Sequence, residues 1–501
     1  MDDRGRLTAA PATARIEVRR LTAIPDLGAL AASNGADVVW LDSSLPDGAP
    51  PTAGARARWS VLAMTDGPFA ARFRHEARRA SVETTSASQR WFGAEPASDR
   101  PAFEVLADLL DRTPTLPEPV SGCGFALGWV GFLGYELGRE SGGVDRTADG
   151  HADADLRFTD RAVVVATGGD AWALALVDDA EPDASVANRA WLDEVGAWST
   201  RADVTEGEPR LLDDATGRVT RADYVAAVEA CRAEIREGNA FQVCLTTAFA
   251  VREARVGPAA DPHLVEYLRL RAVDPVPFGA YLRLGPLRVA SRSPERFLRI
   301  EASGVVSAEP IKGTRRRADD PVEDEAVRRE LAASVKDRAE NVMIVDLLRN
   351  DLLRTAVPGS VHVDRLCDVE TYASVHQMVS TIGAVLPAGV SRAAVVRAAF
   401  PPGSMTGAPK TSAMAIADRL ERAPRGVYSG AIGYFSASGA VDLSVVIRTL
   451  VTVLDDEGSV RTRTFGAGGA VTWSSVASDE ADEVETKTRS VLSGVGSVAR
   501  W

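Results

Sequence analysis

The stretch KDRAENVMIVDLLRND, residues 336–351, reads as part of a helix that we expect to run from near Asp324 to about Leu353. On a helix, residues three positions apart share one face, so Asp337 and Glu340 point in the same direction. A pair of carboxylates on one helix face is either a solvated surface feature or half of a binding site. The sequence around this helix has to decide between the two.

A second acidic segment, SDEADEVETK (478–487), repeats the arrangement on a helix that we expect to start near Asp479. Glu480 and Glu483 share a face there, and Lys487 lies one turn beyond Glu483. Carboxylates that converge from two helices form an oxygen-only site, which suits a hard cation. A site with a small number of protein ligands, completed by water molecules, suits magnesium better than calcium. From spacing alone, a solvated acidic face remains the alternative.

Composition excludes several classes of function. The chain has 501 residues, of which 45% are hydrophobic and 25% charged, so it can bury sizeable cores. Its net charge of -13 argues against a protein that binds nucleic acid or anionic membranes non-specifically. The four cysteines form no C-x-x-C pair, so we expect no cysteine-based zinc site. With no apolar run of about 18 residues and no secretory signal at its start, the chain reads as cytoplasmic.

The pattern of predicted elements indicates an α+β protein. Residues 1–205 read as a β-rich N-terminal domain that includes a hairpin over 162–177, and 219–501 read as a second, catalytic domain. The polar, acidic segment 201–218 marks the boundary. The segment 122–140 carries several glycines among aromatic residues, which indicates close backbone packing and tight turns rather than a plain helix.

The second half opens with clear local signals. Thr220 reads as a helix N-cap with Asp223 three residues later, and Gly238 suits the end of that helix. A strand should follow over 240–247, and further strands over 278–300.

A glycine-rich turn, FPPGSMTGAPK (400–410), resembles a phosphate-binding loop only superficially. Such a loop needs Gly-Lys-Ser/Thr in sequence, and two residues separate Gly407 from Lys410 here. We expect a helix after Pro409, and the free backbone N–H groups at its start are suited to hold a carboxylate. A purely structural turn is the alternative.

Two single residues are candidates for chemistry. Lys312, within EPIKGT (309–314), has apolar and small neighbours, so it can be desolvated and act as a nucleophile. Glu295, within Ser-Pro-Glu, can act as a general acid. Taken alone, Lys312 is more often a surface lysine and His376 a packed or exposed histidine.

The order of these segments resembles one enzyme family. In sequence they are PIKGT (310–314), KDRAENVMIVDLLRND (336–351), FPPGSMTGAPK (400–410), YSGAIGYF (428–435), IRT (447–449) and SDEADE (478–483). They follow one another as in the chorismate-utilising enzymes, which include the large chains of anthranilate, aminodeoxychorismate, isochorismate and salicylate synthases. The resemblance covers about 220–495, with a weaker one through 41–43 and 128–137. It implies large antiparallel sheets packed together, with helices outside.

The resemblance also implies roles for individual residues. Glu340 and Glu483 would coordinate Mg²⁺, with Asp337 and Glu480 beside them, and Glu295 would protonate the departing C4 hydroxyl of chorismate. Basic residues suit this substrate because it is a dianion. The positions that match substrate contacts are Gln242, Gly313, Thr314, Gln377, Thr406, Gly407, Tyr428, Arg448, Gly468, Gly469 and Lys487.

Two positions indicate the branch of the family. The family resemblance places Gln242 at the position where isochorismate and salicylate synthases carry a lysine that activates water. An amide cannot act as a general base in this way. This favours ammonia as the nucleophile. At Lys312, anthranilate synthases read PIAGT, whereas aminodeoxychorismate synthases read PIKGT. The resemblance implies that Lys312 attacks C2 covalently and that ammonia then attacks C4, which gives 4-amino-4-deoxychorismate.

One departure concerns a histidine of the family. Many relatives read V-H-H-L or V-M-H-L, whereas this chain has Gln377 at the second histidine and His376 one residue earlier. If the segment is helical, this offset rotates a side chain by about 100°, so His376 should not replace the missing group. The alternatives are an anthranilate synthase or 2-amino-2-deoxyisochorismate synthase large subunit, and an inactive chorismate-binding or regulatory homologue.

The resemblance further implies two partners. No amidotransferase segment with a nucleophilic cysteine is evident in the sequence, so we expect a separate glutamine amidotransferase subunit to supply ammonia. The segment Leu41, Asp42 and Ser43 resembles a tryptophan-binding motif of the N-terminal domain.

Overall fold

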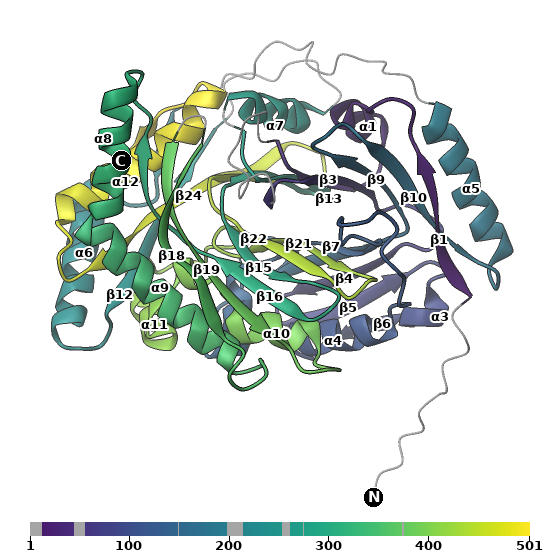
Figure 1. Ribbon diagram of the computed structural model, residues 1–501, viewed down its shortest axis with the longest axis horizontal. Coiled ribbons are helices and arrows are strands. Elements are labelled where there is room, and N and C mark those ends of the chain that lie inside the picture. Colours follow the sequence, from purple (N-terminus) through teal and green to yellow (C-terminus); the bar gives the residue numbers. More distant parts are fainter. Residues whose placement is uncertain are drawn as a thin grey trace, which may run out of the picture.

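The computed structural model describes residues 13–44, 56–148, 150–197, 214–252, 261–273, 275–372 and 375–501. Within these ranges two large β-sheets pack together, and helices lie around the outside (Figure 1). Hydrogen-bonded neighbours run antiparallel, apart from one parallel pair at an edge of the first sheet. This confirms the α+β class and the antiparallel sheets with outer helices.

The first sheet holds thirteen strands of the described residues. They are β1 (Ala14–Arg20), β2 (Val38–Asp42), β3 (Trp59–Met64), β9 (Arg161–Ala166), β10 (Ala171–Asp178), β11 (Ala215–Gly217), β12 (Gln242–Ala250), β13 (Phe278–Leu284), β14 (Leu287–Ser293), β20 (Gly407–Ala408), β23 (Thr449–Leu454), β24 (Val460–Thr472) and β25 (Ala499–Arg500). Their order is β1-β10-β9-β3-β2-β13-β14-β23-β24-β12-β11-β25, and β20 pairs with β12.

The second sheet holds twelve strands of the described residues. They are β4 (Ala71–Glu76), β5 (Arg79–Thr84), β6 (Glu95–Ser98), β7 (Gly128–Leu133), β8 (Ala154–Thr159), β15 (Arg296–Ile300), β16 (Val305–Glu309), β17 (Ile311–Arg316), β18 (His362–Thr371), β19 (Val375–Val385), β21 (Ala431–Ser436) and β22 (Val441–Val445). Their order is β17-β19-β16-β15-β22-β21-β7-β8-β4-β5-β6, and β18 pairs with β19. Both sheets therefore mix strands from 1–205 and 219–501, and the two-domain division stays a prediction whose boundary lies largely outside the described residues.

The helices cover the outer faces of the sheets. They are α1 (Leu27–Ser33), α3 (Gln89–Phe92), α4 (Ala102–Arg112), α5 (Pro182–Ala197), α6 (Arg221–Arg236), α7 (Pro262–Val273), α8 (Pro321–Ala333), α9 (Val335–Leu353), α10 (Arg392–Ala399), α11 (Lys410–Glu421) and α12 (Ala477–Leu492), with short 3₁₀ helices η1 (Tyr135–Ser141), η2 (Gly403–Met405) and η3 (Ser493–Val495). No helix in the described ranges is long and apolar enough to cross a membrane.

Local signals explain where several elements begin and end. The capping box at Thr220 and Asp223 is present at the start of α6, as predicted. The single helix expected over 324–353 was wrong: the chain breaks at Ser334, whose side chain accepts a hydrogen bond from the backbone N–H of Asp337 and so caps a new helix, α9. α9 therefore starts anew at Val335, in the part of the chain that leads directly to Glu340.

The glycine-rich segment 122–140 forms β7 and η1, which confirms the prediction of close packing. At Gly131 the φ angle is 148°, and a Cβ atom there would lie 2.1 Å from the carbonyl oxygen of Asp155 on β8. Only glycine lets these two strands approach so closely.

An aromatic cluster packs between α3 and the second sheet. Phe158 lies 4.9 Å from Phe92 and 5.6 Å from Trp129, measured between ring centroids, and all three are buried. We predict that Phe158→Ala lowers the free energy of unfolding by about 3–5 kcal/mol, because it leaves a cavity in a packed core. Urea denaturation measures the change. Val186→Ala, at an exposed position of α5, should cost less than about 0.5 kcal/mol, and equal midpoints for the two variants would contradict the packing described.

Candidate active site

Lys312 stands at the centre of a group of acids that several elements bring together. It lies on β17, and its charge acts on Glu295 before β15, on Glu340 of α9 and on Glu483 of α12. The segments that carry these residues are separated by up to 188 positions in the sequence, from 295 to 483. The fold therefore assembles the predicted nucleophile, the predicted acid and two predicted metal ligands in one place.

Glu295 has the surroundings of a protonated acid. It is buried between β14 and β15, and burial raises the pKa of its carboxyl group. The charges of Lys312 and Arg448 and the backbone N–H of Ile311 oppose this shift without cancelling it. A raised pKa favours the protonated form of this carboxyl group, which is the form that can donate a proton.

The acids of α9 and α12 converge. Burial raises the pKa of Glu340 to about 7; Lys312 and Lys336 oppose the shift, and the charges of Glu483 and Glu480 add to it. Glu480 is 1% exposed, and its Oε1 accepts a hydrogen bond from Ser475 at 2.7 Å. Its Oε2 is buried and has no hydrogen-bond partner among the described residues. Such an unpaired buried oxygen is costly unless a ligand completes it.

Lysine side chains reach into this acidic group. Lys336 Nζ lies 3.4 Å from Glu480 and 4.0 Å from Glu340. The prediction overlooked Lys336, although its i,i+4 spacing to Glu340 was a signal for it. It likewise overlooked Ser475, for which the sequence offers no comparable signal.

The remaining predicted acids have partners of their own. Lys487 Nζ lies 2.7 Å from Glu483 Oε1 and donates to the carbonyl oxygen of Gly468 at 2.8 Å. Asp337 turns towards Arg315, at 2.9 Å, next to Gly313. Accordingly, no set of three or more His, Cys, Asp or Glu side chains in the described ranges forms a ready-made metal site.

Strands β12 and β24 form a wall of the site, and the lack of a side chain at Gly469 on β24 leaves room for the acidic side chains. A Cβ atom at Gly469 would lie 2.8 Å from Glu480 Oε2 and 3.9 Å from Glu483 Oε1. Across the ladder, Gln242 pairs with Thr472. The side-chain amide of Gln242 is fully buried, and neither its oxygen nor its nitrogen has a partner among the described residues.

The glycine-rich turn closes against β12. Thr406 is buried, and its carbonyl oxygen accepts the N–H of Cys244 at 3.0 Å. Gly407 has a φ of 122°, and a Cβ atom there would lie 2.2 Å from the carbonyl oxygen of Gln242. Pro409 occupies the N-cap of α11 rather than its first turn. Tyr428 packs its ring against the backbone of Gly466.

Gln377 lies on strand β19, not on a helix, so the helical premise was wrong. It is buried and pairs in register with Thr314 of β17. On a strand, neighbouring side chains point to opposite faces. His376 therefore faces away from Gln377, with its Nε2 2.9 Å from Asp324 at the start of α8, and it does not reach the position of the family histidine.

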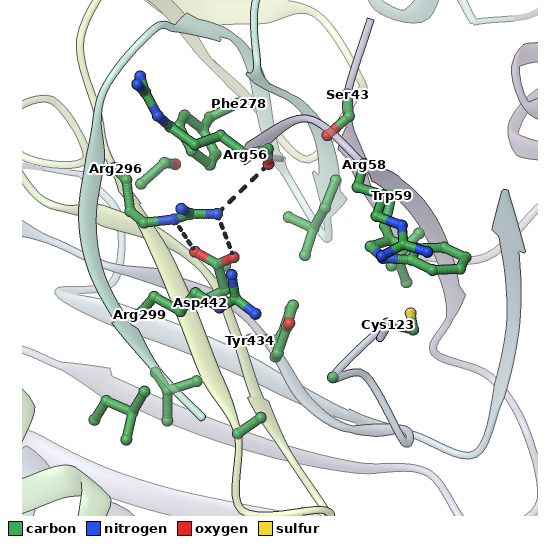
Figure 2. A pocket seen from close by; sticks show the side chains of 18 of the residues that line it. Ser43, Arg56, Arg58, Trp59, Cys123, Phe278, Arg296, Arg299, Tyr434 and Asp442 are labelled. Carbon is green, nitrogen blue, oxygen red and sulfur yellow. Dashed lines mark hydrogen bonds and ion pairs between the residues drawn. The ribbon is translucent and has the colours of Figure 1, made fainter. Parts of the chain in front are cut away.

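The segment 41–43 lies elsewhere, on a separate cavity of about 540 Å³. Figure 2 shows side chains of Ser43, Arg56, Phe278 and Tyr434 around it. The Asp42 carboxylate is held by the Tyr267 hydroxyl at 3.0 Å and by Arg271 at 2.7 Å. The structure thus separates this cavity from the acidic site.

The two-sheet fold is shared with solved structures of chorismate enzymes. Anthranilate synthase component I from Streptococcus pneumoniae superposes with a TM-score of 0.69 at 25% identity, covering 87% of this chain and 92% of that one. The menaquinone-specific isochorismate synthase of Escherichia coli has the same TM-score at 14% identity, covering 97% and 95%, and supports the fold alone.

The sequence matches the family model described as chorismate binding enzyme over residues 64–493, and the chain belongs to that family. The aminodeoxychorismate synthase of Streptomyces griseus is 44% identical, covering 90% of this chain and 60% of that protein. Aminodeoxychorismate synthase component 1 of Escherichia coli (strain K12) is 37% identical, covering 78% and 82%. The chain spans 60–65% of the length of its Streptomyces relatives.

The raised pKa of Glu340 predicts how the stability of the folded protein depends on pH. The native state keeps the Glu340 proton up to about pH 7, whereas the unfolded chain releases it near its ordinary value of 4.5. The native state therefore binds more protons between these values, and its stability falls as the pH rises through them. Glu340→Gln has no titrating carboxyl group at this position, so its stability should not fall in this way.

We expect Glu340→Gln to raise Tm above that of the unmodified protein at about pH 8, with the gain vanishing near pH 4, when both are measured with a chelator present. Asp456→Asn, in an exposed turn, is the matched control and should shift Tm at neither pH. A Tm difference that is the same at both pH values would contradict the shifted pKa.

Proposed function

We propose that this chain aminates chorismate with ammonia to give 4-amino-4-deoxychorismate, on the way to 4-aminobenzoate and folate. The observation that carries the proposal is the position of Lys312 within electrostatic reach of the buried acid Glu295 and of Glu340. The names of the Streptomyces griseus and Escherichia coli relatives support the same reaction.

Lys312 would act as the nucleophile in the first step. As the neutral amine, its Nζ bonds to C2 of the ring and becomes a secondary ammonium, while the bond between C4 and its hydroxyl breaks and the ring double bonds shift between these carbons; the second step releases the neutral amine again. Glu295 donates the proton with which the hydroxyl leaves as water, and the raised pKa of Glu295 favours the protonated form beforehand. Covalent catalysis divides one difficult displacement into two easier ones.

Ammonia would complete the second step. It attacks C4, the double bonds return, and the C2–Nζ bond breaks, which frees Lys312. The proton lost by the new ammonium group restores the Glu295 acid. Gln242 supports ammonia rather than water, because an amide is no general base, and its unpaired Oε1 can accept an N–H.

Other residues would hold the substrate. Arg448 and Lys487 supply positive charge for the carboxylates of a dianion. Thr314, Gln377, Thr406 and Tyr428 belong to the same proposed contact set, as do the backbones of Gly313, Gly407, Gly468 and Gly469.

The acidic group fits Mg²⁺. Its donors are carboxylate oxygens, which a hard cation prefers. Two observations support a cation there: the unpaired Oε2 of Glu480 and the raised pKa of Glu340 beside other acids. Glu340 and Glu483 would hold the ion, with Asp337 and Glu480 beside them. When bound, it supplies charge that binds the ring carboxylate.

A separate glutamine amidotransferase subunit would supply the ammonia. The name "component 1" of the Escherichia coli relative supports a second component. The anthranilate synthase, 2-amino-2-deoxyisochorismate synthase and inactive-homologue alternatives are less favoured, because Lys312 and Glu295 are both present. Tryptophan binding at 41–43 stays a prediction.

We predict that Lys312→Ala lowers the rate of C4 amination by more than about a hundredfold, because the covalent step is lost. The assay supplies chorismate, Mg²⁺ and an ammonium salt and quantifies 4-amino-4-deoxychorismate by mass spectrometry. Arg316→Ala, at an exposed position of the same strand, is the control and should stay within about twofold. Unchanged product formation by Lys312→Ala would refute the nucleophile role.

Metal removal tests the proposed ion. EDTA should abolish amination, and Mg²⁺ should restore it. At about 100 times its Kd, the ion should stabilise the protein by about 2.7 kcal/mol in thermal unfolding. Glu340→Gln should show much less of this stabilisation, whereas Asp456→Asn should keep all of it. Full activity in EDTA, or equal stabilisation of Glu340→Gln, would argue against the site.

A further inference from the structure

A cleft on the protein surface lies next to the acidic site. It has a volume of about 380 Å³ and lies at the junction of α6, the segment that leads into β12, α9 and the turn that follows β24. Glu340 forms part of its lining, so the cleft and the proposed active site share a residue. The cleft is distinct from the cavity at 41–43, with which it has no lining residue in common.

Two exposed aromatic residues form the rim of this cleft. Phe241 is 67% exposed and Trp473 is 62% exposed, and both line the opening. The Arg236 guanidinium lies over the Trp473 ring, 5.6 Å from its centroid. Exposed aromatic side chains gathered at one opening mark a functional surface more often than chance exposure does.

The rim residues adjoin the residue proposed to select the nucleophile. Phe241 directly precedes Gln242, and Trp473 directly follows Thr472, which is the cross-strand partner of Gln242. Phe241, in the bend just before β12, is exposed at the surface, whereas Gln242, the first residue of β12, is fully buried, with an amide that lacks a partner among the described residues.

The lining of the cleft suits a small neutral molecule better than chorismate. Its walls are mainly apolar, and its charged members are Lys336 and Glu340, which lie near each other. Lys312, Arg448 and Lys487, the cations proposed to hold the substrate carboxylates, do not line it. Lys336, the cation among the described residues that line the cleft, already pairs with Glu480 at 3.4 Å and with Glu340 at 4.0 Å. A dianion would therefore lose its hydration there without gaining a free cationic partner, whereas ammonia carries no net charge to desolvate.

We propose that this cleft is the entrance through which ammonia reaches the active site, passing between Phe241 and Trp473 towards the buried Gln242 amide. The inference rests on the proposed function, since it presumes that ammonia is the nucleophile. It adds a route for the nucleophile that is separate from the binding groups of chorismate.

A thiol label at the rim tests the route during turnover. The native cysteines are buried, so Trp473→Cys provides one accessible thiol for a polyethylene glycol maleimide. The label should raise the KM for ammonium at least about tenfold and leave the KM for chorismate within about twofold. Val186→Cys with the same label is the control.

An unchanged KM for ammonium, or an equal rise in both KM values, would overturn the route. If the unlabelled protein forms no C4-aminated product, the proposed function fails instead, and the second measurement, which needs no turnover, then decides on the route.

That measurement follows access to position 242 directly. Methyl methanethiosulfonate, a small neutral reagent, should modify Gln242→Cys, and peptide mass spectrometry gives the rate. Adding Phe241→Ala and Trp473→Ala should speed this modification while leaving the rate at buried Cys231 unchanged. Equal rates at position 242 with and without the rim side chains would overturn the entrance.

Discussion

The burial of neighbouring carboxylates is the constraint on which the site depends. Glu340 and Glu480 are buried, and Glu483 adds its charge to both. The fold tolerates this because Lys336 and Lys487 contribute positive charge at 3.4 Å from Glu480 and at 2.7 Å from Glu483. A cluster so balanced responds strongly to any added charge, whether an ion or an anionic substrate.

The short connection between β14 and β15 then separates this chemistry from the second cavity. Glu295 faces the acidic site, whereas its neighbour Arg296 bonds to Asp442 at 3.0 and 3.1 Å, on the wall of the other cavity (Figure 2). Glu295 and Arg296, which are neighbours in the chain, thus serve the acidic site and the cavity at 41–43 respectively.

The sequence predicted what depends on local pattern and motif order. The capping box at Thr220 followed from spacing, whereas the meeting of the acids of α9 and α12 at one site was implied by the order of the motifs and the family resemblance. It missed what depends on long-range packing. Ser334 breaks a helix that periodicity alone continues, and Gln377 lies on a strand because β17 and β18 pair with its segment. The pairing of Asp337 with Arg315 depends on tertiary geometry that no spacing rule contains.

The central claim is that Lys312 and Gln242 direct ammonia to C4 of chorismate. The most direct measurement identifies the product of the unmodified protein with chorismate, Mg²⁺ and an ammonium salt, by treating it with a lyase that converts 4-amino-4-deoxychorismate to 4-aminobenzoate. Formation of 4-aminobenzoate is the predicted result. Anthranilate or another C2-aminated product would contradict the account.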